Sequence, residues 1–355
     1  MIYTNWDPLE KIIVGNCYTQ VPESWQITGD ARELLNQILR ETKEDLDNLA
    51  NTLTKLGVTV YRPVVYNLPA LVEFPTFKVL MATNPVVPRD QYFAYGNTLY
   101  QTYTSMPDRY IDSLHYYEIF ADLFKQGYNW LSQPPPVLTN FTDKYKWYVE
   151  GPTIYSNLYK DKILWHTATM FKCGDALITN NAGPGTQLGL EWMKRNCDAT
   201  IINNDNTKVD NWGHIDHGFY MIDDNTVICM NETWVPEVLR NKNIIELDGM
   251  FEPFNYQNFI QKTHSIKDQS SLEWLEQWFL EWKGYAQDVA FETNVLVVDS
   301  NNIIFSTEQP KVFELLARHN VNCHVVKQRH GMFWEAGIHC LTLDVSRKGN
   351  RRSVI

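Results

Sequence analysis

The chain has 355 residues and a formal net charge of −11, and 13% of its residues are aromatic. Nucleic acids and anionic membrane surfaces are bound by clustered basic faces, and no basic run here is longer than the pairs at residues 347–348 and 351–352. The composition therefore argues against both as partners. Because no Gly/Ser tract or long charged run interrupts the sequence, we expect one domain over residues 1–355, with a large core or repeated units.

The first residues and the cysteines indicate the compartment. The chain begins without a basic segment followed by an apolar stretch, so no signal peptide is predicted. No run approaches the roughly 20 apolar residues of a membrane span. Six cysteines are scattered without a CxxC pair, which is typical of reduced thiols. We therefore expect a cytoplasmic protein with no membrane partner.

The first part of the chain predicts a helix and then strands. Residues 41–56 form an amphipathic helical pattern that ends at Gly57, where a glycine is expected, and the strand 58–61 follows. Residues 88–90 open a predicted strand pair around the turn at residues 96–97.

Three later segments each predict strands, a helix and a further strand. The first has a strand at 175–179, a glycine-rich turn at 183–185, a helix at 187–196 and a strand at 199–202; the second has strands at 219–222, 226–229 and 243–247 with a helix at 235–241; the third has strands at 295–299, 303–305 and 323–326 with a helix at 309–319. Repeated ββαβ-like units suggest modules around a centre, each delivering a strand end to a shared cleft.

Cys340 is the main candidate for a catalytic residue. It follows a short turn at residues 335–337 and precedes the apolar run 341–345, so it lies where a loop meets a strand. A thiolate beside an imidazole can attack a planar electrophilic carbon. The alternative is a small buried hydrophobic residue, the role we expect for the other five cysteines.

His214 and Asp216 are the candidates for side chains that act together with Cys340. On a strand, alternation places both on one face, where His214 would be a general acid/base and Asp216 would bind a cationic group. A second hypothesis makes His214, Asp216 and His217 metal ligands, although a strand directs His217 to the opposite face. His166 or His339 would complete that set. A third hypothesis is a histidine satisfied within a polar core.

Two further motifs carry weaker signals. Asp90, at a strand entrance, would lie at the cleft or would be an ordinary acidic turn residue. The Gly-Pro-Gly sequence at 183–185 lacks the spacing of a phosphate loop, so a plain loop is expected there.

Several of these stretches together resemble one family, the glycine (arginine:glycine) amidinotransferases and their inosamine-phosphate relatives. The matching segments are residues 5–15 (NWDPLEKIIVG), 57–63 (GVTVYRP), 88–90 (PRD), 188–195 (LGLEWMKR), 214–216 (HID) and 337–340 (GIHC). They recur in the same order over nearly the whole chain, and they are specific as a set.

The resemblance implies an α/β protein with the pentein fold, a five-bladed α/β propeller of ββαβ modules with pseudo-fivefold symmetry. It implies that Cys340 attacks the guanidinium carbon of arginine and forms an amidino-thioether. His214 would protonate the leaving amine and later deprotonate the acceptor amine. Asp216 and Asp90 would hold guanidinium nitrogens, which orients the cation for attack.

The chain departs from the family at residues that hold the substrate. Where the family has Phe-Asp-Ala-Ala-Asp, residues 165–169 are Trp-His-Thr-Ala-Thr, so His166 replaces the first acid. The family's arginine that clamps the substrate carboxylate falls near Trp234, and its paired serines fall near Asp288. We therefore assign His166 to the catalytic set and Trp234 and Asp288 to substrate binding, with an altered donor.

The first hypothesis is an amidinotransferase that moves an amidino group from arginine or another guanidino donor to an amine acceptor. It needs no metal or other cofactor, and a homodimer is compatible with it. The alternatives are hydrolysis at the same carbon by deiminase or dihydrolase chemistry, an idle pentein domain that binds a small ligand or a protein, and a metal hydrolase.

Overall fold

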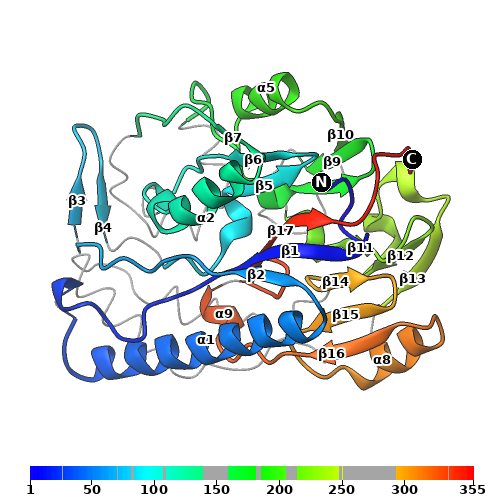
Figure 1. Cartoon of the computed structure of the whole chain (residues 1–355), viewed down its shortest axis with the longest axis horizontal. Helices are drawn as coiled ribbons and strands as arrows, with labels where there is room; N and C mark the ends of the chain where they lie inside the picture. Colours follow the sequence, from blue (N-terminus) through cyan, green and yellow to red (C-terminus); the bar gives the residue numbers. More distant parts are fainter. Residues whose placement is uncertain are drawn as a thin grey trace.

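The computed structural model describes residues 1–25, 27–69, 71–80, 84–106, 109–138, 159–180, 185–204, 214–247, 250, 293–334 and 336–355. Within these residues, five three-stranded sheets share one design (Figure 1). Each has two antiparallel strands, and a third strand runs parallel to the middle one. This repeated ββαβ pattern is the architecture of the pentein fold, as expected from the sequence.

We call each three-stranded sheet a blade. The blades consist of β17 (Thr342–Arg347), β1 (Leu9–Val14) and β2 (Thr59–Tyr61); β5 (Tyr92–Tyr95), β6 (Thr98–Gln101) and β7 (Asn129–Ser132); β8 (Met170–Cys173), β9 (Ala176–Asn180) and β10 (Thr200–Asn204); β11 (Phe219–Met221), β12 (Thr226–Cys229) and β13 (Asn243–Glu246); and β14 (Leu296–Asp299), β15 (Asn302–Phe305) and β16 (Asn322–Val325). Four blades have a helix before the third strand, namely α1 (Gly29–Lys55), α2 (Ser113–Lys125), α5 (Gln187–Asn196) and α8 (Pro310–Ala317). The β11–β12–β13 blade has only the 3₁₀ segments η6 (Glu232–Trp234) and η7 (Glu237–Leu239) there.

The remaining described elements are short. They are η1 (Glu23–Trp25), the hairpin of β3 (Leu71–Glu73) and β4 (Lys78–Leu80), η2 (Pro88–Asp90), η4 (Thr167–Thr169), η5 (Ile215–His217) and α9 (Gly331–Trp334). Three of them precede the first strand of a blade, and η4 contacts both η2 and η5. Among the described helices, none combines the length and the apolar stretch that a membrane crossing requires.

The first strand of each blade is buried along nearly its whole length. All residues of β5, β8 and β11 are buried, whereas the third strands β10, β13 and β16 are partly exposed. A strand covered on both faces is built mainly of apolar side chains, and the exception here is Lys172 in β8, whose ammonium lies 3.4 Å from Asp344. The loops that enter the first strands therefore converge on the centre of the molecule.

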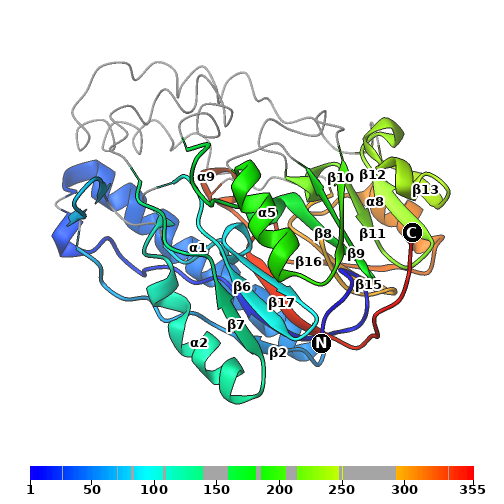
Figure 2. The ribbon, with the colours of Figure 1, turned by 90° about the horizontal axis from the view of Figure 1, so that it is seen from above.

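The last strand closes the ring against the first. β17 pairs antiparallel with β1, and Val14 lies opposite Thr342. Figure 1 shows β17, β1 and β2 side by side, and β17 and β2 also lie near one another in Figure 2. Beyond β17, the Arg352 guanidinium makes two hydrogen bonds of 2.8 Å to Asp7, which ties the C-terminal tail to the segment before β1.

A buried ionic cluster lies at the centre. Asp344 on β17 accepts hydrogen bonds from Arg89 at 2.7 Å and from Arg347 at 3.0 Å, and the Lys172 ammonium lies 3.4 Å from it. Asp344 and Lys172 have no exposed surface, and Arg89 and Arg347 are buried. Burial, with the neighbouring cations Arg89 and Arg347, lowers the pKa of Lys172 to about 7 despite the attraction of Asp344.

Most elements expected from the sequence are confirmed. The helix at 187–196 has the expected bounds, and the three expected hairpins around residues 96–97, 223–225 and 300–301 are present. The helix ending at Gly57 is longer than expected, because the apolar spacing already begins at Leu34 and Leu35, which are buried. Gly57 has φ +86°, the left-handed conformation expected at a helix end.

Two local predictions are wrong. The expected helix at 235–241 is the short 3₁₀ turn η7, because Pro236 holds Val235 in an extended conformation. The expected strand at 214–216 is also wrong, since residues 215–217 form η5 and only His214 before it has extended backbone.

Candidate active site

Cys340 lies in the turn directly before β17 and is fully buried. Its loop packs closely against Asn294, the residue that leads into β14. A Cβ atom on Gly337 would lie 2.5 Å from the Asn294 Oδ1, so the loop needs glycine at this position. The predicted position of Cys340, where a loop meets a strand, is confirmed.

Asn294 connects Cys340 to Asp216. Its Nδ2 donates to the Cys340 Sγ at 3.0 Å and to the Asp216 Oδ2 at 2.9 Å. Its Oδ1 accepts hydrogen bonds from the backbone N–H groups of His339 at 3.0 Å and Cys340 at 3.3 Å. One buried amide therefore orients both the thiol and a carboxylate. Asn294 was not predicted from the sequence, although a polar side chain directly before the buried apolar run 295–298 could have indicated a site residue.

His339 makes a second contact to the same oxygen of Asp216. Its Nδ1 lies 2.6 Å from the Asp216 Oδ2, and both side chains are buried. Burial, with the Arg89 cation, lowers the pKa of His339 to about 4, so its ring is neutral at pH 7. Nδ1 then donates to Asp216, and Nε2 accepts from the Asn5 Nδ2 at 3.4 Å.

Asp216 is an ionised, buried carboxylate. Burial raises the pKa of Asp216, but the hydrogen bond from His339 outweighs this effect and helps to hold the pKa well below the usual range. Its Oδ2 is bound by His339 and Asn294, whereas its buried Oδ1 has no hydrogen-bond partner in the described structure. This oxygen is available to an N–H group or a cation brought into the site.

His214 is buried and lies beside Cys340. One ligand atom from each of His214, Asp216, His217 and Cys340 forms a group in which all atoms lie within 4.8 Å of one another. The rings of His214 and His217 have centroids 5.3 Å apart. The expectation that His217 points away is wrong, because residues i and i+3 lie on the same side of a 3₁₀ turn.

Asp90 and His166 lie on the other side of His214. The His166 Nε2 is 3.8 Å from the Asp90 Oδ1, and the rings of His166 and His214 have centroids 4.9 Å apart. One ligand atom from each of the three residues lies within 4.8 Å of the other two. The two groups share His214, so they form one continuous site of six side chains.

Arg109 occupies one face of Asp90. Its Nη1 donates to the Asp90 Oδ2 at 2.7 Å, while Asp112 and the Val87 carbonyl hold the rest of the guanidinium. Burial raises the pKa of Asp90, but His166 and Arg109 outweigh it and hold the value below the usual range. Like Asp216, Asp90 is an anion with one oxygen bound and one, Oδ1, without a hydrogen bond in the described structure.

The structure brings five of the seven predicted residues together, namely Cys340, His214, His166, Asp90 and Asp216. Trp234 lies in η6 and is half-buried, and within the described part of the chain no hydrogen bond or ring contact joins it to this group. Asp288 lies outside the described residues. Trp234 and Asp288 therefore stay predictions.

The other five cysteines have raised pKa values because their thiols are buried or partly buried. Burial raises the pKa of Cys17, Cys173 and Cys229 to about 12 and that of Cys323 to about 11. These groups are protonated thiols at neutral pH, as expected for residues that serve packing.

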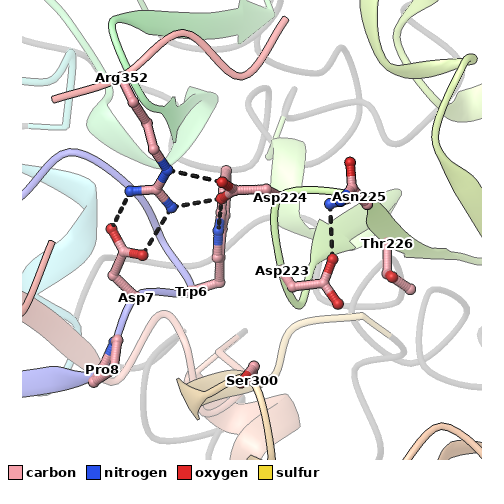
Figure 3. A pocket seen from close by; sticks show the side chains of 9 residues that line it. All are labelled: Trp6, Asp7, Pro8, Asp223, Asp224, Asn225, Thr226, Ser300 and Arg352. Atoms are coloured by element: carbon pink, nitrogen blue, oxygen red, sulfur yellow. Dashed lines mark hydrogen bonds and ion pairs between the residues drawn. The ribbon is translucent and has the colours of Figure 1, made fainter. Parts of the chain in front are cut away.

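A separate pocket of about 410 Å³ lies beside the hairpin turns that join β11 to β12 and β14 to β15 (Figure 3). It is lined by Trp6, Asp7, Pro8, Asp223, Asp224, Asn225, Thr226, Ser300 and Arg352. Arg352 bridges Asp7 and Asp224, and the Trp6 Nε1 donates to Asp224 at 2.8 Å. Asp7, Asp224 and Arg352 are paired with one another, Asp223 accepts the backbone N–H of Asn225, and none of the predicted site residues lines the pocket.

Five three-stranded blades around buried cysteine, histidine and aspartate side chains define a pentein-fold protein with the residue types of a covalent catalytic site. The homologues of this chain are inosamine-phosphate and glycine amidinotransferases. Inosamine-phosphate amidinotransferase 1 of Streptomyces griseus is 26% identical over 98% of this chain and 96% of its own length. Mitochondrial glycine amidinotransferase of Xenopus tropicalis is 21% identical over 99% of this chain and 83% of its own length. No family model matches the chain.

Solved structures agree on the fold. The inosamine-phosphate amidinotransferase structure from Streptomyces griseus superposes with a TM-score of 0.74 at 24% identity, covering 99% of this chain and 98% of that one. An amidinotransferase of the saxitoxin biosynthetic pathway from Microseira wollei also gives 0.74, at 19% identity over 100% and 99% of the chains. A dimethylarginine dimethylaminohydrolase in an adduct with S-methyl-L-thiocitrulline is more distant, with a TM-score of 0.51 at 13% identity over 94% and 99%.

Proposed function

We propose that the protein transfers an amidino group from a guanidino donor to an amine acceptor through a covalent intermediate on Cys340. The observation that carries the proposal is the group of Cys340, His214 and Asp216 within 4.8 Å, in a chain whose homologues are amidinotransferases. A guanidinium is a poor electrophile, because resonance spreads its charge. The site must therefore hold the cation, supply a thiolate and protonate a leaving amine.

Two carboxylates would hold the donor. The Oδ1 atoms of Asp216 and Asp90 are buried and lack hydrogen bonds in the described structure, so each can accept an N–H of the guanidinium. Such charge-assisted hydrogen bonds fix the plane of the cation. Asn294, by holding both Asp216 and Cys340, keeps the carboxylate and the sulfur in register.

The reaction then proceeds in two steps. The Cys340 thiolate attacks the guanidinium carbon, and His214 donates a proton to the nitrogen that leaves as an amine, which gives an amidino-thioether. The acceptor amine next attacks the same carbon and passes a proton to His214. The carbon–sulfur bond breaks, so the thiolate and a new guanidino compound are released.

His166 distinguishes this site from the family pattern. It occupies the position of a family acid and lies against Asp90 and His214, so we propose that it belongs to the catalytic set. Loss of one charge-assisted anchor typically costs about 2–3 kcal/mol of binding, so free arginine should bind weakly. We further propose a donor other than free arginine, with Trp234 and Asp288 contacting the part of the substrate beyond the amidino group.

We also propose that residues 1–355 act as one catalytic domain in the cytoplasm, with a homodimer as a compatible assembly. All six cysteines are free thiols, which supports a reducing compartment.

Hydrolysis at the same carbon is the second candidate. The fold neighbours include an arginine dihydrolase whose N-terminal domain was solved covalently bound to a reaction intermediate, with a TM-score of 0.52 at 10% identity. In this case water replaces the amine in the second step. Product analysis with and without glycine, lysine or another primary amine separates the two, because transfer yields a new guanidino compound only when the amine is present.

A panel of guanidino donors, followed by mass spectrometry of the intact protein, tests the proposal. Wild type should gain the mass of an amidino group, and Cys340→Ala should gain none. Cys323→Ala is the matched control, because it removes another thiol and should keep the adduct. An adduct that persists in Cys340→Ala would contradict the proposal, and an idle binding protein would form none with any donor.

A further inference from the structure

The site holds more metal-binding groups than amidino transfer requires. His217 has no role in the two steps above, yet it lies with His214, Asp216 and Cys340 in one group. We propose that these four side chains bind a zinc ion, and that the ion and the guanidino donor exclude one another. The zinc site itself does not depend on the proposed function; the exclusion of the donor rests on it.

The donor set matches zinc in chemistry and in charge. Zinc in proteins is bound by cysteine sulfur, histidine nitrogen and carboxylate oxygen, usually with four ligands. A thiolate and a carboxylate together neutralise the two positive charges of the ion, which favours its binding away from water. Magnesium and calcium prefer sets made of oxygen atoms, so the sulfur and the two imidazoles favour zinc over both.

The geometry requires only small movements. Bonds of about 2.0–2.3 Å in a tetrahedral site place the ligand atoms roughly 3.3–3.6 Å apart. The present atoms lie within 4.8 Å of one another, so rotations that close the group by about 1 Å complete it. His214 and His217 are spaced i and i+3 on one 3₁₀ turn, which presents both rings on the same side.

Asp216 is already prepared as a ligand. Its Oδ2 is held by His339 at 2.6 Å and by Asn294 at 2.9 Å, while its buried Oδ1 has no hydrogen bond in the described structure. Partners of this kind orient a ligand and raise its affinity for metal. The buried Oδ1 is the observation, independent of the cluster of residue types, that indicates a cation or an N–H donor at this point.

A second group, Asp90, His166 and His214, is the competing location. His214 cannot complete both groups with the same atom. The group that contains Cys340 has four ligands and a thiolate, whereas the other has three and no sulfur. We therefore assign the ion to the Cys340 group, and a variant of His166 distinguishes the two locations.

Zinc at this position would block amidino transfer by direct competition. It would coordinate the sulfur that attacks and the imidazole that moves protons, and it would occupy the Asp216 oxygen that receives the guanidinium. Removal of the ion would restore all three groups. The expected behaviour is reversible inhibition that a saturating donor relieves.

Metal titration of the purified, metal-free full-length protein tests the site without an activity assay. Cobalt(II) should bind in one equivalent and give the near-ultraviolet charge-transfer band of a cobalt–thiolate bond, and zinc should displace it. Cys340→Ser should lose the band. His217→Gln should weaken zinc binding at least tenfold, because it removes one of four ligands. His166→Gln and the exposed His319→Gln are the controls and should bind as wild type does.

Several results would overturn the proposal. They are absence of cobalt binding, a charge-transfer band that survives in Cys340→Ser, and unchanged zinc affinity in His217→Gln. A loss of affinity in His166→Gln alone would move the ion to the Asp90 group and would also overturn it.

An activity assay then tests the exclusion of the donor. Zinc should raise the apparent KM for the donor, and a chelator should reverse the effect. Zinc should inhibit His217→Gln less strongly than it inhibits wild type at the same zinc concentration. If no guanidino donor is turned over at all, the proposed function fails while the cobalt titration still decides the metal site.

Discussion

Charged side chains are arranged differently at the two ends of the first strands of the blades. At the hairpin end, Arg352 is bonded to both Asp7 and Asp224 beside a pocket that the three side chains help to line. At the loop end, Asp216 and Asp90 are buried with one oxygen bonded and the other without a hydrogen bond. The ion pairs link the two terminal segments of the chain. Each of the two buried carboxylates instead keeps one oxygen that a ligand can bind.

Between the two ends lies the Asp344 cluster, which belongs to neither pattern. One carboxylate faces three cations, and the whole group is buried. Arg89 also donates to the His339 carbonyl at 2.8 Å, so the cluster supports the loop that carries Cys340. The four predictions below separate the roles of the three regions.

The largest effect is expected from Cys340→Ser at the loop end. Loss of the nucleophile should lower turnover on the order of a thousandfold or more, because oxygen in this environment is a far weaker nucleophile than a thiolate. The midpoint of unfolding in urea should change little, since the two side chains differ by one atom. Turnover within tenfold of wild type would remove Cys340 from the mechanism.

Asn294→Ala should give the next largest effect. It removes the hydrogen bonds to Sγ and to the Asp216 carboxylate, and bonds to charged groups contribute about 1.5–3 kcal/mol each. We expect a loss of turnover on the order of tenfold to a hundredfold. Alkylation of Cys340 by iodoacetamide should also require a higher pH in the variant than in wild type, which a purely structural role of Asn294 would not cause.

The matched control is Asn225→Ala in the hairpin turn at the other end, which should leave both measurements unchanged. An Asn294→Ala protein whose alkylation follows the wild-type pH profile would show that the amide does not assist the sulfur.

Lys172→Met tests the central cluster through its pH dependence. The pKa of Lys172 falls from 10.5 in the unfolded chain to about 7 in the folded protein, so between these values the unfolded chain binds more protons. Below pH 7 the buried ammonium of Lys172 therefore destabilises the folded protein by its full amount. This destabilisation decreases as the pH rises and the group loses its proton. Wild type should gain about 2 kcal/mol of unfolding free energy relative to Lys172→Met between pH 7 and pH 9.

Urea unfolding of both proteins at several pH values measures this difference, and groups common to both cancel. A constant difference across the range would mean that Lys172 does not change its protonation there.

Arg352→Ala should have the smallest effect. Its ion pairs with Asp7 and Asp224 are partly exposed, so solvent screens them and their loss should cost about 1 kcal/mol of stability. The cost should shrink at high salt, and turnover of the folded protein should not change. A large fall in turnover would show that closure of the termini and catalysis are coupled.

The residues of the site were largely predictable, because their chemistry is local. Cys340 before an apolar run, the His214–Asp216 pair and Asp90 at a strand entrance are each visible as short patterns. The repeated hairpins are visible too, since turn residues and apolar alternation act over a few positions. The direction of His217 was not, because it depends on a 3₁₀ turn where alternation predicted a strand.

By itself, the sequence determined the repeated modules, the residue types of the site and the likeness to amidinotransferases, because periodicity and motifs are properties of neighbouring residues. Only the tertiary structure decided that β17 closes on β1, that Asn294 holds Cys340 and Asp216 together, and that Asp344 gathers three cations. These contacts join residues up to several hundred positions apart. They form when burial brings the blades together, and no local pattern specifies which distant side chains will then meet.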